Sequence, residues 1–85
     1  MNVTLDLTGE SSRLLVSGIP HEYALYIIDT DLHDYNLRMA DPGNKLAYTY
    51  ILGRLTIAGQ ERWLRNFCEV YSFAYKVEYP FPPMP

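Results

Sequence analysis

The sequence predicts an α+β domain in which an antiparallel sheet of about four or five strands packs against one or two helices. Three segments carry this prediction: a hairpin pattern near the start, an amphipathic helical pattern over residues 60–71, and an alternating aromatic pattern after it. A chain of 85 residues has the length of one domain. We therefore assign residues 1–79 to a single compact domain and residues 80–85 to a proline-rich tail.

The opening residues predict a β-hairpin. Val3, Leu5 and Leu7 alternate with polar residues, as in a strand with one buried face. The segment TGESS follows as a cluster of turn-forming residues, and RLLV returns as a short buried strand that ends before Gly18. The two strands should pair with each other because so short a connection leaves them adjacent.

A helix is expected over residues 20–32, with a strand as the alternative. Pro20 suits the first helical position, and a glutamate follows in the first turn. Leu25, Ile28 and Leu32 recur at helical spacing, although the tyrosine, isoleucine and threonine content favours a strand. The next segment, YNLRM, is expected to be a short strand or the approach to a turn, and ADPGNK predicts the turn itself.

Two interpretations remain open for the segment from residue 45 to residue 58. As a strand it places Leu46, Tyr48, Tyr50 and Leu52 on one face, with a bulge or turn at the glycine that follows. As a helix it aligns apolar residues along one side and ends at the next glycine. The β-branched and aromatic content favours the strand.

Residues 60–71 predict an amphipathic helix. Its apolar face comprises Trp63, Leu64, Phe67, Cys68, Val70 and Tyr71. On the opposite face, Glu61 with Arg65 and Arg65 with Glu69 form two opposite-charge pairs at i,i+4 spacing, which stabilise a helix.

The closing stretch predicts a strand with an aromatic face that packs under this helix. That face comprises Phe73, Tyr75, Val77, Tyr79 and Phe81, and we expect Trp63 and Phe67 of the helix to pack onto it. Pro80 cannot donate a ladder hydrogen bond, so the prolines are interpreted as a strand terminator that also blocks edge-to-edge association. The alternative is a polyproline ligand, because Pro80–Pro83 and Pro82–Pro85 have PxxP spacing.

Charge and cysteine content limit the function classes. The net charge is −3, divided into −5 over residues 1–41 and +2 over residues 42–85. This acidic excess argues against non-specific nucleic-acid binding, which needs several cations, but it leaves room for a basic face in the second half. The single Cys68 excludes an internal disulfide and a multi-cysteine zinc site. No targeting or membrane-spanning segment is visible, so we expect a cytoplasmic protein, of the source cell or of an infected host.

No catalytic constellation stands out. The segment DTDLHD places Asp29, Asp31 and His33 where they could contribute ligands to a divalent metal, but a solvated acidic turn is the preferred interpretation. Cys68 with His21 or His33 could form a nucleophile and base, but a cysteine on the apolar side of a helix behaves as a small hydrophobe. We therefore expect no enzyme, no metal and no cofactor.

The acidic band is the first candidate surface for binding a protein. Asp29, Asp31 and Asp34 are flanked by Tyr26 and Tyr35, and an acidic surface that carries tyrosines suits a partner with a basic surface. The second candidate is the sheet itself. One helix covers one face, so an open face or an edge bearing Tyr48, Tyr50, Tyr75 and Tyr79 would remain free to form a homodimer.

These observations favour a small non-catalytic protein-binding module that occupies a partner's surface. In size, acidity and lack of a catalytic set, the chain resembles the small inhibitors and adaptors of phages and mobile elements, including anti-CRISPR proteins. This resemblance is one of general character and rests on no motif. The alternative function is a DNA-binding regulator whose helix-turn-helix covers residues 45–71, with Arg62 and Arg65 on its exposed face.

Overall fold

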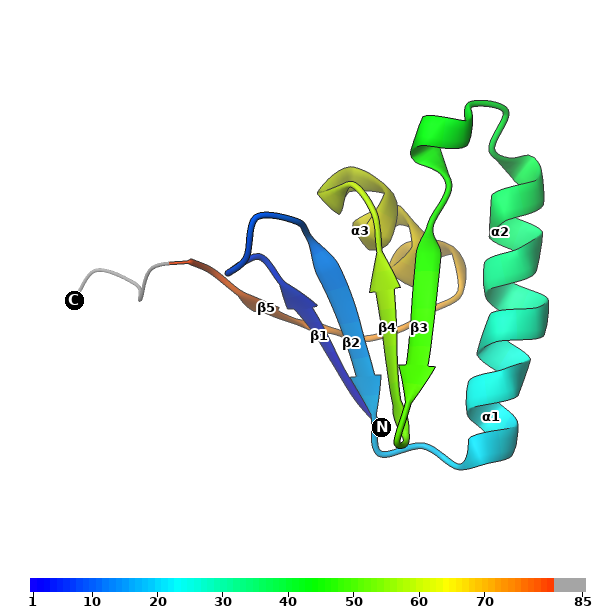
Figure 1. The fold of residues 1–85 in the computed structure, drawn as a ribbon, viewed down its shortest axis with the longest axis vertical. Coiled ribbons are helices and arrows are strands. Elements are labelled where there is room, and N and C mark those ends of the chain that lie inside the picture. Colours follow the sequence, from blue (N-terminus) through cyan, green and yellow to red (C-terminus); the bar gives the residue numbers. More distant parts are fainter. Residues whose placement is uncertain (81–85) are drawn as a thin grey trace.

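A five-stranded sheet in the order β3-β4-β2-β1-β5 forms the centre of the molecule in the computed structural model, which describes residues 1–80 (Figure 1). Its strands are β1 (Asn2–Asp6), β2 (Arg13–Ser17), β3 (Ala47–Ile51), β4 (Arg54–Ala58) and β5 (Lys76–Glu78). The α+β class is confirmed, but the sheet is mixed rather than antiparallel, because β5 pairs parallel to β1. The helix between β4 and β5 returns the chain to the starting end of the sheet, so β4 and β5 run in the same direction as β1.

Two hairpins build the antiparallel part of the sheet. The predicted first hairpin is confirmed, and its register places Val3 opposite Val16 and Leu5 opposite Leu14. The second hairpin pairs β3 with β4, so the strand interpretation of residues 45–58 is confirmed. A turn at Leu52 and the following glycine joins its strands.

One continuous helix runs from His21 to Arg38 as α1 (His21–Tyr26), a π-helical stretch (Ile27–Leu32) and α2 (His33–Arg38). Pro20 precedes it in extended conformation, as expected for its start. The predicted end at residue 32 is wrong, and so is the expected strand or turn at YNLRM. The helix continues because its second half is held by distant contacts: Tyr35 is buried in the core and Asn36 bonds to Leu46.

The helix α3 (Glu61–Val70) confirms the second helical prediction. Leu64, Phe67 and Cys68 are buried, while Trp63 lies at the margin of the core and Val70 is exposed. Glu61 and Arg65 form the expected ion pair, with Nε and Oε2 2.9 Å apart. The expected Arg65–Glu69 pair is not among the ion pairs of residues 1–80, because Arg65 also turns toward the Tyr75 hydroxyl.

The predicted closing strand is shorter than expected. Only Lys76–Glu78 pair with β1, while Phe73 is buried before the strand and stacks on Phe67 at 5.7 Å between ring centroids. Tyr79 is exposed, and Phe81 lies outside the described residues. The PxxP spacings of the tail also extend beyond the described part, so they remain a prediction.

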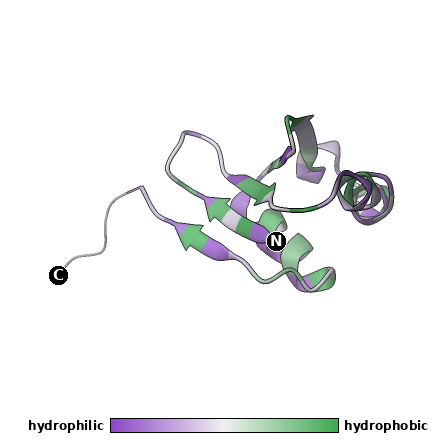
Figure 2. Cartoon of the chain, turned by 90° about the horizontal axis from the view of Figure 1, so that it is seen from below, coloured by the Kyte–Doolittle hydropathy of each residue, from purple (hydrophilic) through white to green (hydrophobic). Residues whose placement is uncertain are grey.

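The helices leave one face of the sheet uncovered. Along the strands, hydrophobic and hydrophilic residues alternate (Figure 2). The hydrophobic sides of β1, β2 and β4 are buried beneath α3, and the long helix lies along the β3 side. The opposite face points toward the viewer in Figure 1 and carries no helix from residues 1–80. Within the same residues, no helix has both the length and the apolar character that spanning a membrane requires.

Candidate functional site

The predicted acidic band does not form one surface. Tyr26 and Asp29 are exposed, whereas Tyr35 is 2% exposed and packs edge-on against Phe67. Its hydroxyl donates to Asn66 Oδ1 at 2.8 Å. The placement of Tyr35 at the binding surface is therefore wrong, because the helix turns this side chain into the core.

Asp34 belongs to a cluster between the long helix and α3. Its Oδ2 accepts a hydrogen bond from the Tyr71 hydroxyl at 2.6 Å and lies 3.2 Å from Arg38 Nε. The Tyr71 hydrogen bond lowers the pKa of Asp34, while burial and the neighbouring carboxylate raise the pKa of Tyr71 to about 12. These contacts tie Asp34 to the structure of the helix pair.

Asp31 and Asp29 occupy different surroundings. Partial burial is the main cause that raises the pKa of Asp31, and repulsion from Asp34 raises it further. Asp29 instead lines a hollow on the β3 side of the helix and forms no ion pair within residues 1–80. Asp29 is thus the member of the predicted band that combines exposure with a neighbouring concave surface.

The catalytic and metal alternatives gain no support from the geometry. Cys68 is buried, and this burial raises the pKa of its thiol to about 11, so the group is a poor nucleophile. Asp29 and His33 line the same hollow, but no group of three or more potential ligands within residues 1–80 could hold a metal ion.

The helix-turn-helix alternative is wrong in its first helix. Residues 47–58 form the β3–β4 hairpin instead. The two arginines that would read DNA have partners within the chain: Arg62 lies over the Trp63 ring at 4.9 Å, and Arg65 donates to Glu61.

The uncovered sheet face is also unlike a surface that binds single-stranded nucleic acid. The register aligns Thr49, Thr56, Leu15, Thr4 and Lys76 in one row across this face. That row contains no aromatic ring on which a base could stack. Arg13 on the same face is paired with the buried Asp6, at 2.7 Å between Nη2 and Oδ2.

Side-chain contacts connect the outer edge of β3 to the long helix at both ends of the strand. Asn36 Nδ2 donates to the Leu46 carbonyl and Asn36 Oδ1 accepts from the Leu46 N–H, both at 2.8 Å. This side-chain amide thereby takes the place of a neighbouring strand. At the other end, His21 Nδ1 lies 3.0 Å from the Tyr50 hydroxyl and the two rings stack at 5.6 Å.

Between these two contacts the outer edge of β3 has no neighbouring strand from residues 1–80, and we call it the open edge. Backbone groups of alternate residues point to the same side of a strand, so the N–H and C=O groups of Tyr48 and Tyr50 point outward like those of Leu46. The hairpin register leads to the same orientation. Ile51 and Arg54 flank the two-residue turn, so their backbone groups point toward each other, and those of Tyr50 and Tyr48 point to the outer side of β3.

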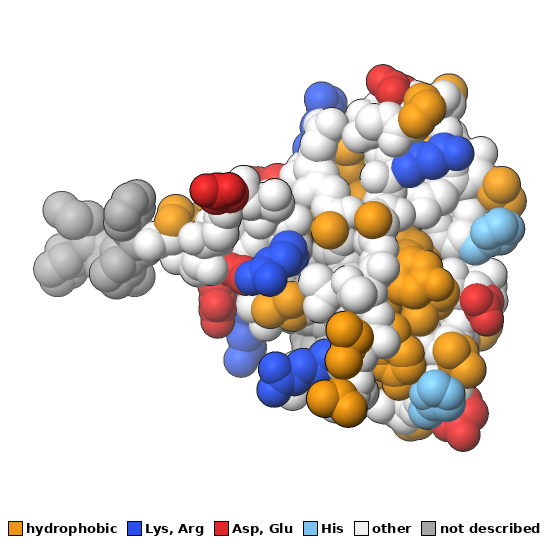
Figure 3. Space-filling model, viewed as in Figure 1, with side chains coloured by type: hydrophobic (Ala, Val, Ile, Leu, Met, Phe, Trp, Pro, Cys, Tyr) orange, Lys and Arg blue, Asp and Glu red, His pale blue; other side chains and the backbone are white. Residues whose placement is uncertain are grey.

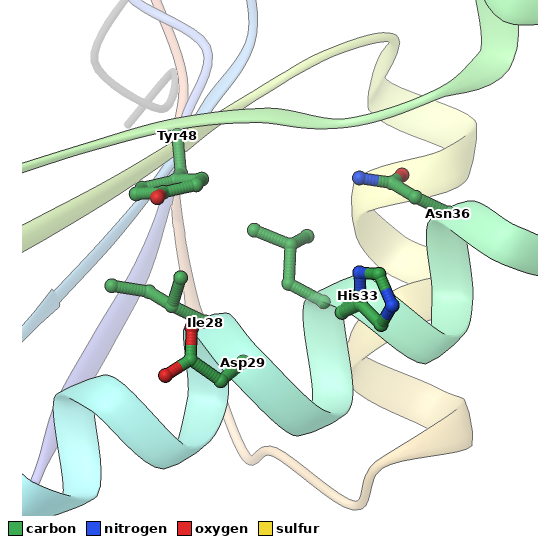
Figure 4. A pocket seen from close by; sticks show the side chains of 6 residues that line it. Ile28, Asp29, His33, Asn36 and Tyr48 are labelled. Carbon is green, nitrogen blue, oxygen red and sulfur yellow. The ribbon is translucent and has the colours of Figure 1, made fainter.

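A hollow of about 370 Å³ separates the open edge from the helix. The side chains of Ile28 and Leu32, which are 8% and 1% exposed, form its apolar base. Figure 4 shows the Tyr48 ring extending from β3 toward Ile28, with Asp29 on the helix beside it. The hollow thus has an apolar base at Ile28 and Leu32 and a polar rim that includes Asp29, His33 and Asn36.

The tip of the β3–β4 hairpin carries a strained, exposed leucine. Leu52 has a φ of +51° and Gly53 a φ of +79°, as a tight primed turn requires. Leu52 is 97% exposed and the neighbouring Ile51 is 61% exposed. The prediction that Leu52 continues the strand on one face with Leu46, Tyr48 and Tyr50 is therefore wrong, because Leu52 belongs to the turn that follows β3.

Tyr48 lies on the helix side of β3, and Ile51 and Leu52 lie on the uncovered side and at the hairpin tip; together they form what we name the hairpin surface. Tyr48 is 52% exposed, so all three side chains expose apolar area along the β3 edge and the hairpin tip. Figure 3 shows hydrophobic side chains in a band between the sheet and the helix and at the hairpin end of the sheet. Ile51 and Leu52 also border a hollow of about 730 Å³ on the uncovered sheet face.

Comparison with known proteins identifies no relative. No family model, no curated protein and no solved structure matches this chain. Function must therefore be inferred from the geometry of the chain itself.

Sequence reasoning missed Asn36 and Leu52. For Leu52 a signal existed, because Leu-Gly between two β-rich segments can form a two-residue hairpin turn.

Proposed function

We propose that this protein is a small non-catalytic binding module that occupies the surface of a partner protein, as an inhibitor or an adaptor. The hairpin surface is its contact region. The observation that carries this proposal is Leu52, which is almost fully exposed in a left-handed backbone conformation.

Leu52 destabilises the free protein in two ways. A leucine in the left-handed region costs roughly 1 kcal/mol relative to glycine, and asparagine also adopts this conformation readily. An exposed leucine side chain contributes no burial energy within the chain. Strained residues persist where function requires them, and exposed apolar groups become stabilising when a partner covers them. A binding role accounts for both features.

The surroundings of Leu52 fit a protein contact. Ile51 adds a second apolar side chain, Tyr48 adds a ring with a polar end, and Arg54 follows the turn. Tyrosine and arginine are enriched among the energetic centres of protein interfaces, and apolar side chains fill the interface core around them. The free thiol of Cys68 fits a reducing compartment, so we expect the partner to be cytoplasmic.

The test compares three tagged baits in host or source lysate treated with nuclease: the wild type, Leu52→Asn and Leu37→Asn. Leu37 is a matched control, because it is 70% exposed but lies on the long helix. We expect a protein that the wild type and the Leu37 variant retain and the Leu52 variant loses. Equal retention by all three baits contradicts the proposed contact region, and the absence of any nuclease-resistant partner contradicts the binding function.

A further inference from the structure

We infer that the groove between β3 and the long helix binds an extended segment of the partner that carries a lysine or arginine. The segment adds to the sheet as a sixth strand beside β3. This inference rests on the proposed function and specifies the chemistry of the partner. Three features of the groove support it: the open backbone edge, the shape of the hollow, and the charge of the helix that borders it.

The backbone edge supplies the pairing groups. Tyr48 and Tyr50 direct their N–H and C=O groups outward, and the Asn36 amide already occupies the strand position beside Leu46. A strand that approaches β3 is therefore limited at one end by Asn36 and at the other by His21, which stacks on Tyr50. Main-chain hydrogen bonds of this kind give affinity in strand-addition complexes, and pockets for alternate side chains give specificity.

The hollow supplies a place for one side chain of the added strand. Its apolar base at Ile28 and Leu32 suits the methylene stem of a lysine or arginine. Its rim carries Asp29, whose carboxylate has no ion-pair partner within the described residues. A long side chain with an apolar stem and a cationic end matches both parts.

The charge of the bordering helix selects a basic segment over a second copy of this chain. Asp29 is the carboxylate that lines the groove, whereas Asp34 faces Tyr71 and is paired with Arg38. Pairing of two β3 edges would bring a second Asp29 toward the same groove without supplying a cation for the first, and like charges disfavour such contacts. Edge-to-edge dimerisation is therefore the competing outcome of the test.

The probe is a short capped peptide that alternates lysine with valine, titrated into the isotope-labelled full-length chain and observed by amide NMR. A peptide with glutamate in place of each lysine is its matched control. We expect shifts centred on the Tyr48 and Tyr50 amides and on the Asn36 side-chain amide with the lysine peptide only. Asp29→Asn should weaken this binding about three- to fivefold, as the loss of one partly exposed ion pair does. Asp31→Asn, on the other side of the helix, should not.

Several results overturn the inference. Equal binding of both peptides removes the selection for charge, and shifts confined to the uncovered sheet face move the site elsewhere. Concentration-dependent shifts at Tyr48 and Tyr50 without peptide indicate pairing of two copies instead. If the lysine peptide causes no shifts while the lysate partner still depends on Leu52, the inference fails and the proposed binding function stands.

Discussion

The two outer strands of the sheet, β3 and β5, differ in how their edges are protected. β5 has three residues, two of which are the charged Lys76 and Glu78, and Pro80 follows it closely. β3 has five residues, AYTYI, without a charge or a proline. Short length, charge and proline are the usual devices that prevent edge-to-edge pairing. The β5 edge is therefore guarded by its own residues and the β3 edge is not.

This difference indicates where the chain can accept a partner. β3 is covered only where Asn36 and His21 attach the helix to it, and the stretch between these residues borders a groove. The adjoining turn exposes Leu52. An unguarded edge, a groove and a strained apolar tip occur together on the β3 side. We interpret this coincidence as a contact surface, and the following changes test it.

The largest expected effect distinguishes the two sides of β3 itself. Thr49→Pro should destabilise the fold by roughly 3 kcal/mol, because the Thr49 N–H points toward β4 and proline removes it from the ladder. Tyr48→Pro should cost only about 1 kcal/mol, because the Tyr48 N–H points outward, where an edge strand tolerates proline. Urea denaturation measures both. Similar losses for the two variants would mean that the β3 edge is not oriented as described.

The next effect concerns Asn36, whose hydrogen bonds to Leu46 mark one end of the open edge of β3. Asn36→Ala leaves the N–H and C=O of Leu46 without their partner, and we expect a loss of about 2 kcal/mol in the free energy of unfolding. Leu37→Ala on the same helix is the control. Leu37 is 70% exposed, so its change should stay within about 0.5 kcal/mol. A small loss at Asn36 would indicate that water replaces the amide readily.

A smaller change, of opposite sign, is expected at the hairpin tip. Leu52→Asn should stabilise the free protein by about 0.5 to 1 kcal/mol, because asparagine accepts the left-handed conformation more readily than leucine. Thermal melting measures this gain. A lower melting temperature would show that Leu52 supports the fold through contacts of its own, which would contradict a role reserved for binding.

The smallest expected effect lies on the guarded side and depends on pH. Asp6 accepts hydrogen bonds from the Thr8 hydroxyl and N–H and from Arg13, and these bonds, led by that of the Thr8 hydroxyl, lower the pKa of Asp6. The carboxylate therefore stabilises the fold at pH values above its unfolded pKa of 3.8, and this contribution disappears as the pH falls below that value. The Arg13 side chain is 48% exposed, so solvent screens the ion pair.

Asp6→Asn is the matched test of this pH dependence. The variant should lose less stability than the wild type between neutral pH and pH values below 3.8, as followed by denaturation at each pH. Identical pH profiles would show that Asp6 titrates alike in the folded and unfolded chains.

The elements that the sequence predicts well depend on local patterns. The first hairpin, the start of the long helix at Pro20 and the whole of α3 follow from alternation, capping and helical periodicity. The long helix beyond residue 32 does not, because Tyr35 and Asn36 are fixed by partners distant in the sequence, Phe67 and Leu46. The parallel direction of β5 likewise depends on the crossover through α3, which no local pattern encodes.

The candidate site was predictable in part. Tyr26 and Asp29 are exposed, as an acidic surface requires, but a linear band of acids ignores how a helix distributes its side chains. Asp34 faces Tyr71 and Tyr35 faces the core, while Asp29 faces the groove. The open edge of β3 could not be predicted, because it depends on where Asn36 meets Leu46.

Amide hydrogen exchange of the two sheet edges tests the central claim most directly. The chain is compared free and bound to the partner that the wild-type bait retains and the Leu52→Asn bait loses. We expect slower exchange in the complex at Tyr48 and Tyr50, with β5 (Lys76–Glu78) unchanged. Slower exchange at β5 with no change along β3 would contradict it.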